Sequence, residues 1–193
     1  MNKAWVLALG LSTALVALPA AAQFYVGAGV GQSKAKDFCG GGGGFDSCDD
    51  KDKAWKVYGG YAFSPYFAAE IGYSDLGRFK ATLAPFTDEA KASAWEISAL
   101  GAWPIVPRFS IFGRLGFYAA TVKESTNFAG EFKNDNSDLT YGLGMQFNIT
   151  RNLAVRGEWQ RYQKMGGGEV ALGAGVGEKS DLDVLGLSAL WRF

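Results

Sequence analysis

Six ionisable residues lie within stretches where apolar residues alternate with small or polar ones, and their charges could pair with one another. Glu96, for example, lies between Trp95 and Ile97. In a β-strand this spacing puts the charged side chain on the opposite face from its apolar neighbours. Charges enclosed by such strands must be paired or hydrated, because burying an isolated ion is costly. The six residues are Lys56, Glu70, Glu96, Arg114, Arg156 and Glu158.

The three positive and three negative side chains of this set favour a salt-bridge network. If the strands enclose a narrow lumen, we expect the network to plug it, because the interior of a small barrel is only wide enough for side chains to fill. The alternative is a gated ion path, in which the same charges exchange partners.

Catalysis is not expected, because the 193 residues include no histidine. Histidine is the side chain used most often for general acid–base catalysis. No spacing typical of a serine–lysine or paired-carboxylate mechanism replaces it. The sequence therefore predicts a protein that is not an enzyme, with no cofactor and no catalytic metal.

Cys39 and Cys48 are the only cysteines, and both lie in one polar, glycine-rich segment. If this segment is exported, an oxidising compartment favours a disulfide between them. In the simple chain model, closing so short a loop lowers the unfolded-state entropy by about 2–3 kcal/mol. We expect this gain to go to local order of the loop and not to the stability of the barrel. Free thiols and metal ligation are the alternatives, the latter without any histidine to assist.

Other polar residues allow two interpretations each. Four aspartates near Cys48 could bind a divalent cation, but their spacing does not match the EF-hand, and a solvated acidic loop is the simpler hypothesis. Arg161 and Lys164 could contact lipopolysaccharide phosphates or could be simple charges at the rim of a strand. The four aspartates are Asp46, Asp49, Asp50 and Asp52.

The N-terminal segment differs from the rest of the chain. Lys3 is followed by an apolar run and by Ala20-x-Ala22, the small-residue pattern of a secretory cleavage site. We expect a cleavable signal peptide at 1–22 and one domain at 23–193. An uncleaved membrane helix is the alternative, but the run is short for a span of about 20 residues. The 19 basic and 19 acidic residues balance, which argues against a nucleic-acid partner.

Eight stretches after the leader show the period-two alternation of β-strands. Long and short connections alternate between them, as in barrels that cross a membrane with turns on one side and loops on the other. The predicted fold class is therefore all-β, an eight-stranded antiparallel up-and-down transmembrane β-barrel with both termini periplasmic. The strands are expected at 23–32, 53–63, 66–76, 92–103, 109–122, 139–149, 153–162 and 182–193. Outer loops are expected at 33–52, 77–91, 123–137 and 165–180.

A soluble barrel of the lipocalin type is the rival fold, and it would turn its apolar side chains inward. Here the apolar face is rich in aromatic residues, as interfacial girdles require. The other face is mainly glycine, alanine and serine, which suits a narrow lumen better than contact with water. We therefore expect Trp95, Phe147 and Trp159 to face lipid.

Five segments carry a resemblance to a known family: GGYAFSP at 59–65, AEIGY at 69–73, YGLGMQF at 141–147, TRNLAVRGEWQRY at 150–162 and LSALWRF at 187–193. The whole predicted domain resembles the OmpA-like and related small eight-stranded outer-membrane β-barrel proteins. The resemblance implies that the last strand, with Trp191 and Phe193, is the signal read by the outer-membrane assembly machinery. Larger members carry a peptidoglycan-binding domain after the barrel; because this sequence ends at Phe193, that activity is not expected.

The resemblance and the missing catalytic residues together predict an integral protein of the Gram-negative cell outer membrane with a structural or surface-interaction role. Its expected partners are outer-membrane lipid and lipopolysaccharide, the assembly machinery, and an extracellular ligand at the loops. A small porin-like channel for ions or small solutes is the alternative function.

Overall fold

The computed structural model describes residues 23–36, 47–49, 51–83, 86–126, 130–165 and 180–193. The regular structure in these ranges is entirely β-strand, as the period-two alternation predicts. Within them, no helix is long and apolar enough to cross a membrane. The strands are β1 (Gln23–Ala35), β2 (Ser47–Asp49), β3 (Lys51–Ala62), β4 (Phe67–Leu83), β5 (Phe86–Val106), β6 (Phe109–Thr126), β7 (Gly130–Asn148), β8 (Leu153–Met165) and β9 (Ser180–Arg192).

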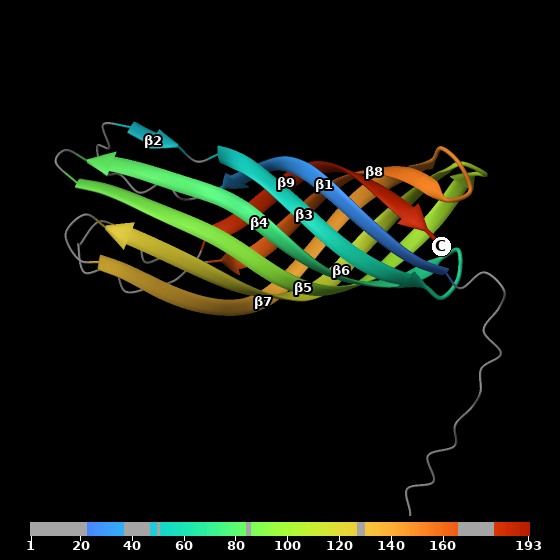
Figure 1. Cartoon of the computed structure of the whole chain (residues 1–193), viewed down its shortest axis with the longest axis horizontal. Helices are drawn as coiled ribbons and strands as arrows, with labels where there is room; N and C mark the ends of the chain where they lie inside the picture. Colours follow the sequence, from blue (N-terminus) through green and yellow to red (C-terminus); the bar gives the residue numbers. More distant parts are fainter. Residues whose placement is uncertain (1–22, 37–46, 50, 84–85, 127–129, 166–179) are drawn as a thin grey trace, which may run out of the picture.

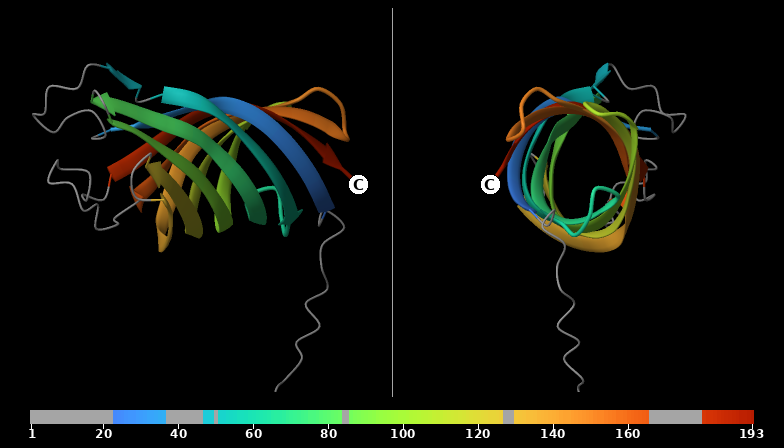
Figure 2. Two further views of the ribbon diagram at one scale, coloured as in Figure 1. Left: turned by 60° about the vertical axis from the view of Figure 1, so that its left-hand side comes forward. Right: turned by 90° about the vertical axis from the view of Figure 1, so that its right-hand side faces the viewer.

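Eight of these strands form a closed antiparallel ring (Figure 1). The long strands pair in chain order, and β1 also pairs with β9, from Tyr25 opposite Arg192 to Ala35 opposite Leu182. Figure 2 shows the resulting barrel along its axis. The short β2 lies outside the ring and pairs with Lys80–Thr82 at the end of β4. The predicted fold class, an eight-stranded antiparallel up-and-down barrel, is confirmed.

The two ends of the barrel differ in their connections. Short turns join β3 to β4, β5 to β6 and β7 to β8 at one end, which we call the short-turn end. Both Gln23 and the C-terminus lie there, and the Phe193 N–H donates to the carbonyl oxygen of Phe24 at 3.0 Å. The connections that follow β1, β4, β6 and β8 lie at the opposite end, which we call the long-connection end because those after β1 and β8 are long.

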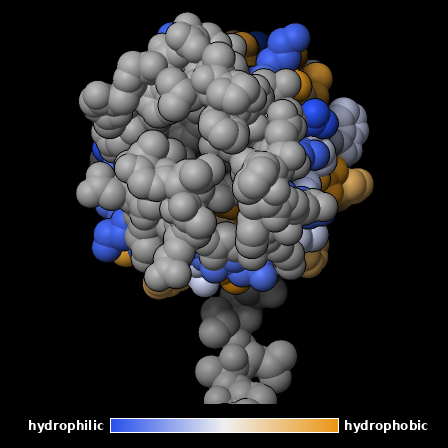
Figure 3. Space-filling model, turned by 90° about the vertical axis from the view of Figure 1, so that its left-hand side faces the viewer, coloured by the Kyte–Doolittle hydropathy of each residue, from blue (hydrophilic) through white to orange (hydrophobic). Residues whose placement is uncertain are grey.

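The outer wall of the barrel is apolar. Val30, Leu143 and Leu187 each expose 65% or more of their surface, whereas their strand neighbours of opposite parity are half-buried or buried. Figure 3, which looks onto the long-connection end, shows hydrophobic side chains among hydrophilic ones at the edge of the view. The apolar residues therefore point away from the axis, which is the opposite of a lipocalin-type barrel.

Aromatic side chains on the outer wall gather at two levels. Near the short-turn end, the ring of Tyr61 lies 4.8 Å from that of Phe24, measured between centroids. Nearer the other end, the Tyr73 ring lies 5.6 Å from the Trp55 ring and 5.1 Å from the Trp95 ring. Two aromatic bands that flank an apolar belt are typical of barrels in lipid, where they mark the two membrane interfaces.

Inside the barrel, glycines make room for two tyrosines. The register places Tyr25 opposite Gly60, and Gly27 opposite Tyr58. A methyl group on either glycine would collide with the ring that lies across it. Small residues thus let bulky side chains fold flat against the inner wall, where they occupy part of a narrow lumen.

Strands extend further at the long-connection end than the sequence predicts. The loops expected at 77–91 and 123–137 are wrong, because most of these residues belong to paired strands. Their polar side chains interrupt the apolar alternation, but ladder hydrogen bonds join backbone groups and need no apolar side chain. The strand limits are Leu83 for β4, Phe86 for β5, Thr126 for β6 and Gly130 for β7. The expected loops at 33–52 and 165–180 lie largely outside the described residues.

Gly77 marks the point where β4 leaves the regular barrel register. The pairing with β5 shifts between Asp75 and Gly77, and Gly77 has a φ of 88°. That conformation favours glycine, since a side chain would be strained there. The bulge is fixed by two carboxylates: Asp75 accepts from the Gly77 N–H at 3.1 Å, and Asp52 accepts from the Arg78 N–H at 2.6 Å.

We expect Gly60→Ala to lower the free energy of unfolding by about 1–3 kcal/mol, because the added methyl group would displace the Tyr25 ring that lies across Gly60. The matched control is Gly101→Ala, since a methyl group on Gly101 meets no other atom within 4 Å and should change the free energy by less than about 0.5 kcal/mol. Urea unfolding of the refolded protein, followed by tryptophan fluorescence, measures both. Equal losses for the two variants would contradict the packing argument.

Candidate functional site

The candidate site is the charged interior of the barrel. Inward-facing residues have even numbers on β3, β4, β5, β6 and β8, so the alternation that sends apolar side chains outward sends the charges inward. Glu70 and Arg114 are each only 3% exposed, and Glu96 and Arg156 only 4%. The structure brings together all six residues that the sequence analysis singles out, Lys56, Glu70, Glu96, Arg114, Arg156 and Glu158.

Arg114 is the centre of the arrangement. Its Nη2 lies 2.5 Å from Oε2 of Glu70, and its Nη1 lies 3.2 Å from Oε1 of Glu96. Its Nε donates to Oε1 of Glu158. The three carboxylates come from β4, β5 and β8, so one guanidinium from β6 connects four strands across the lumen. A planar group with donors in several directions is suited to this role.

Two further cations complete the network. The Nζ of Lys56 lies 2.6 Å from Oε1 of Glu96, and the Nη1 of Arg156 lies 2.6 Å from Oε1 of Glu70. The six charges therefore form one connected and electrically balanced set. Such pairs offset the cost of burying the charges only when the remaining donors and acceptors are also satisfied.

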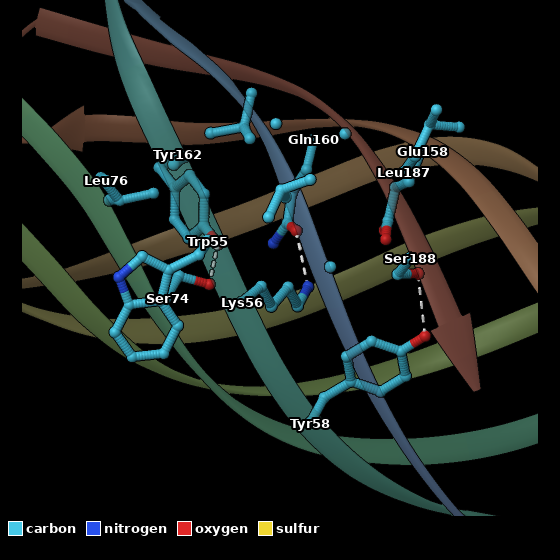
Figure 4. Close-up of a pocket in the computed structure, with 16 residues that line it drawn as sticks. Trp55, Lys56, Tyr58, Ser74, Leu76, Glu158, Gln160, Tyr162, Leu187 and Ser188 are labelled. Atoms are coloured by element: carbon cyan, nitrogen blue, oxygen red, sulfur yellow. Dashed lines mark hydrogen bonds between the residues drawn. The ribbon is translucent and has the colours of Figure 1, made fainter. Parts of the chain in front are cut away.

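Neutral side chains supply several of those remaining hydrogen bonds. The Tyr25 hydroxyl donates to Glu70 Oε1 at 2.7 Å, and the Tyr162 hydroxyl donates to Glu96 Oε2 at 2.7 Å. The Gln160 amide donates to the same Glu96 oxygen at 2.8 Å and accepts from Lys56 Nζ at 2.9 Å. Figure 4 shows the Lys56–Gln160 bond beside a pocket of about 50 Å³.

The sequence analysis missed these neutral partners. Gln160 and Tyr162 share the inward parity of Arg156 and Glu158 on β8, and Tyr25 shares the parity of the glycines on β1, so the same alternation could have identified them. Arg192 was also missed, although it is charged and lies on the polar parity of β9.

A second and larger cavity lies on the other side of the network. Its volume is about 370 Å³, and its lining runs from turn residues such as Ser64 and Pro107 at the short-turn end to Tyr25 and Arg156 within the barrel. The ion pairs therefore lie between this cavity and the smaller pocket, which is lined by Lys56 and other residues nearer the long-connection end.

The remaining residues of interest are spread over the barrel surface and its ends. Trp191 and Phe193 are exposed at the end of β9, by 49% and 70%. Arg161 forms a two-pronged ion pair with Asp183, through Nε at 2.6 Å and Nη2 at 2.8 Å, and it stacks over the Trp159 ring. Lys164 is exposed near the end of β8.

The loop predictions are only partly covered by the structure. Cys48 lies in β2, but Cys39 lies outside the described residues, as do Asp46 and Asp50. The disulfide and the cation-binding hypothesis therefore stay predictions. Among the described residues, no group of three or more histidine, cysteine, aspartate or glutamate side chains could hold a metal ion.

A closed eight-stranded barrel with an apolar outer wall and a charged, buried interior defines the class of outer-membrane barrel proteins. Comparison with known sequences agrees: residues 19–193 match the OmpA-like transmembrane domain, and the chain belongs to this family. It is an integral protein of the outer membrane, and members of the family are non-enzymatic. The family resemblance drawn from the sequence is confirmed.

The sequence relatives include outer membrane protein A of Escherichia fergusonii, which is 28% identical over 192 residues. This alignment covers 95% of the chain and 52% of the relative. Outer membrane protein A of Klebsiella aerogenes is 26% identical over 137 residues, which is 71% of the chain and 38% of the relative. The chain thus spans about half the length, or less, of these curated relatives.

Solved structures of low sequence identity share the fold. Neisserial surface protein A has a TM-score of 0.63 at 14% identity, covering 88% of this chain and 97% of that one. Ail of Yersinia pestis, solved in complex with the heparin analogue sucrose octasulfate, has a TM-score of 0.56 at 16% identity, covering 90% and 99%. The N-terminal barrel domain of OprF from Pseudomonas aeruginosa has a TM-score of 0.56 at 10% identity, covering 89% of this chain and 99% of that one.

Replacing Arg114 by methionine should lower the free energy of unfolding by about 3–5 kcal/mol, because three carboxylates inside the barrel would lose their shared counter-charge. Protonation of these carboxylates would remove the unbalanced negative charge. The loss should therefore shrink as the pH falls toward the ordinary range of glutamate, about 4–5.

The control for this experiment is Arg161→Met, which removes an ion pair on the outer wall and should cost at most about 1 kcal/mol. Urea unfolding at pH 7 and pH 4.5 measures both variants. A loss for the Arg114 variant that equals the control, or that grows at low pH, would contradict the role assigned to Arg114.

Proposed function

We propose that this protein is a structural or surface-interaction component of the outer membrane, in which a plugged barrel anchors the four connections at the long-connection end. The observation that carries the proposal is the single connected network centred on Arg114. It joins β4, β5, β6 and β8 across the lumen and fills the middle of the barrel with paired side chains. A lumen closed by mutually paired charges is suited to an anchor rather than to free passage of solutes.

The proposed orientation has both termini and the short-turn end in the periplasm. It is supported by the connections after β1 and β8, which are longer than any turn at the short-turn end, since outer-membrane barrels keep short turns inside and longer loops outside. The proposal includes removal of residues 1–22 as a signal peptide. It also includes recognition of Trp191 and Phe193 by the assembly machinery, for which their exposure at the end of β9 is favourable.

The proposed partners are lipid and lipopolysaccharide along the wall and an extracellular ligand at the loops. Lys51 and Lys164 are exposed near the long-connection end, where their cations favour contact with the anionic groups of lipopolysaccharide. Arg161 is already paired with Asp183, which supports the interpretation of Arg161 as a charge at the rim of the barrel and not as a lipopolysaccharide contact. The solved complex of Ail with a sulfated sugar supports testing polyanions at the loop end.

A small channel for ions or small solutes is the second candidate function. The observation in its favour is that the network separates two cavities, of about 50 and 370 Å³, which an exchange of ion-pair partners could join. The two functions differ in whether the unmodified barrel conducts.

In planar bilayers, the refolded protein should give no steady conductance, because the ion pairs close the lumen. Arg114→Ala should introduce measurable currents, whereas Arg161→Ala on the outer wall should not. Heat-modifiable gel mobility establishes that each variant is folded, and Glu96→Gln serves as a milder second variant of the network. Steady, sizeable currents from the unmodified protein, together with swelling of liposomes in small solutes, would favour the channel.

The proposed Cys39–Cys48 disulfide has a separate test. Alkylation of the exported protein should add no mass until a reductant is supplied, and two alkyl groups afterwards. Cys48→Ser should change the free energy of unfolding of the barrel by less than about 0.5 kcal/mol, because β2 lies outside the ring. Alkylation of both thiols before reduction would exclude the disulfide.

A further inference from the structure

The cavity at the short-turn end has an unusual set of charges. Two arginines line it, Arg156 at its inner end and Arg192 on β9. No aspartate or glutamate is found among the described residues that line it. With Arg192 added, the interior set holds four cations, namely Lys56, Arg114, Arg156 and Arg192, against the three carboxylates of Glu70, Glu96 and Glu158. One positive charge is thus left over at this end of the barrel.

Two neutral amides connect the arginines. The Nη2 of Arg156 donates to Oε1 of Gln146 at 3.1 Å, and the Nε2 of Gln146 donates to Oδ1 of Asn148 at 3.3 Å. The Nη2 of Arg192 donates to the same Asn148 oxygen at 2.8 Å. The amide oxygens are therefore turned toward the cations, but they contribute dipoles and no negative charge.

Neither arginine has its capacity for hydrogen bonds filled. Arg156 uses Nη1 for Glu70 and Nη2 for Gln146, and its Nε has no partner among the described residues. The Arg156 guanidinium also lies over the Phe112 ring, 4.7 Å from its centroid, which holds its plane in position. Arg192 forms no ion pair with a carboxylate in the described part of the chain, although its side chain is half-buried.

We infer that this cavity is a binding site for a small oxyanion of the phosphate or carboxylate class, held between Arg192 and Arg156. Guanidinium groups bind such anions through paired, charge-assisted hydrogen bonds. Apolar walls, which include Leu100 and Leu190, strengthen the attraction by limiting solvent screening. A cavity of about 370 Å³ accommodates such an anion with water around it. The inference is independent of whether the barrel is an anchor or a channel.

The test uses the refolded full chain in detergent micelles and follows the arginine Nε–H resonances by NMR. Inorganic phosphate, added at constant ionic strength set by chloride, should shift the Arg156 and Arg192 signals in a saturable way and leave the Arg161 signal unchanged. A parallel titration with acetate tells whether carboxylate groups share the site. Binding of either anion supports the inference.

Two variants of equal charge sharpen the test. Asn148→Asp puts a carboxylate where Arg192 now meets an amide oxygen, and it should weaken anion binding at least tenfold while the barrel stays folded. Thr150→Asp adds the same charge at the same end outside the cavity, where it can still accept from the Asn152 and Leu153 N–H groups, and binding should be unchanged. Absence of saturable shifts in the folded protein, or equal weakening in both variants, would overturn the inference.

Discussion

The contact of one buried guanidinium with three carboxylates is the interaction on which the interior of this barrel depends. Arg114 neutralises charges from three other strands in a space where each of them would otherwise be costly to enclose. Arginine suits the position because it stays charged when buried and offers donors along a rigid plane. Lys56 and Arg156 then balance the remaining charge from either side.

This interior is possible because the barrel places its apolar side chains on the outside. The outer wall, formed by residues such as Val30 and Leu187, contacts lipid. Because the ring is closed, no unpaired strand edge faces the hydrocarbon. The lumen is left to side chains that fit together by hydrogen bonding. Glycines opposite Tyr25 and Tyr58 give these rings the room to reach the charged groups.

The electrostatic character changes along the axis of the barrel. The middle holds balanced charge, and the short-turn end carries an excess cation at Arg192. The outer wall near the other end carries ion pairs such as Arg161 with Asp183 beyond the aromatic band. An OmpA-like barrel can therefore present different chemistry to its two surroundings while its lipid-facing wall stays uniform.

The sequence by itself determined which way each side chain of a strand points, because facing depends only on a local period of two. That was enough to predict a closed eight-stranded barrel and to assign Lys56 and Glu96 to the polar face. Only the tertiary structure decided which carboxylate each cation contacts, since partners on different strands depend on register and on the curvature of the ring. It also decided where β4 ends and β5 begins, because backbone pairing continues through polar sequence. Finally, it gave Arg192 the amide oxygen of Asn148 as its hydrogen-bond partner instead of a carboxylate.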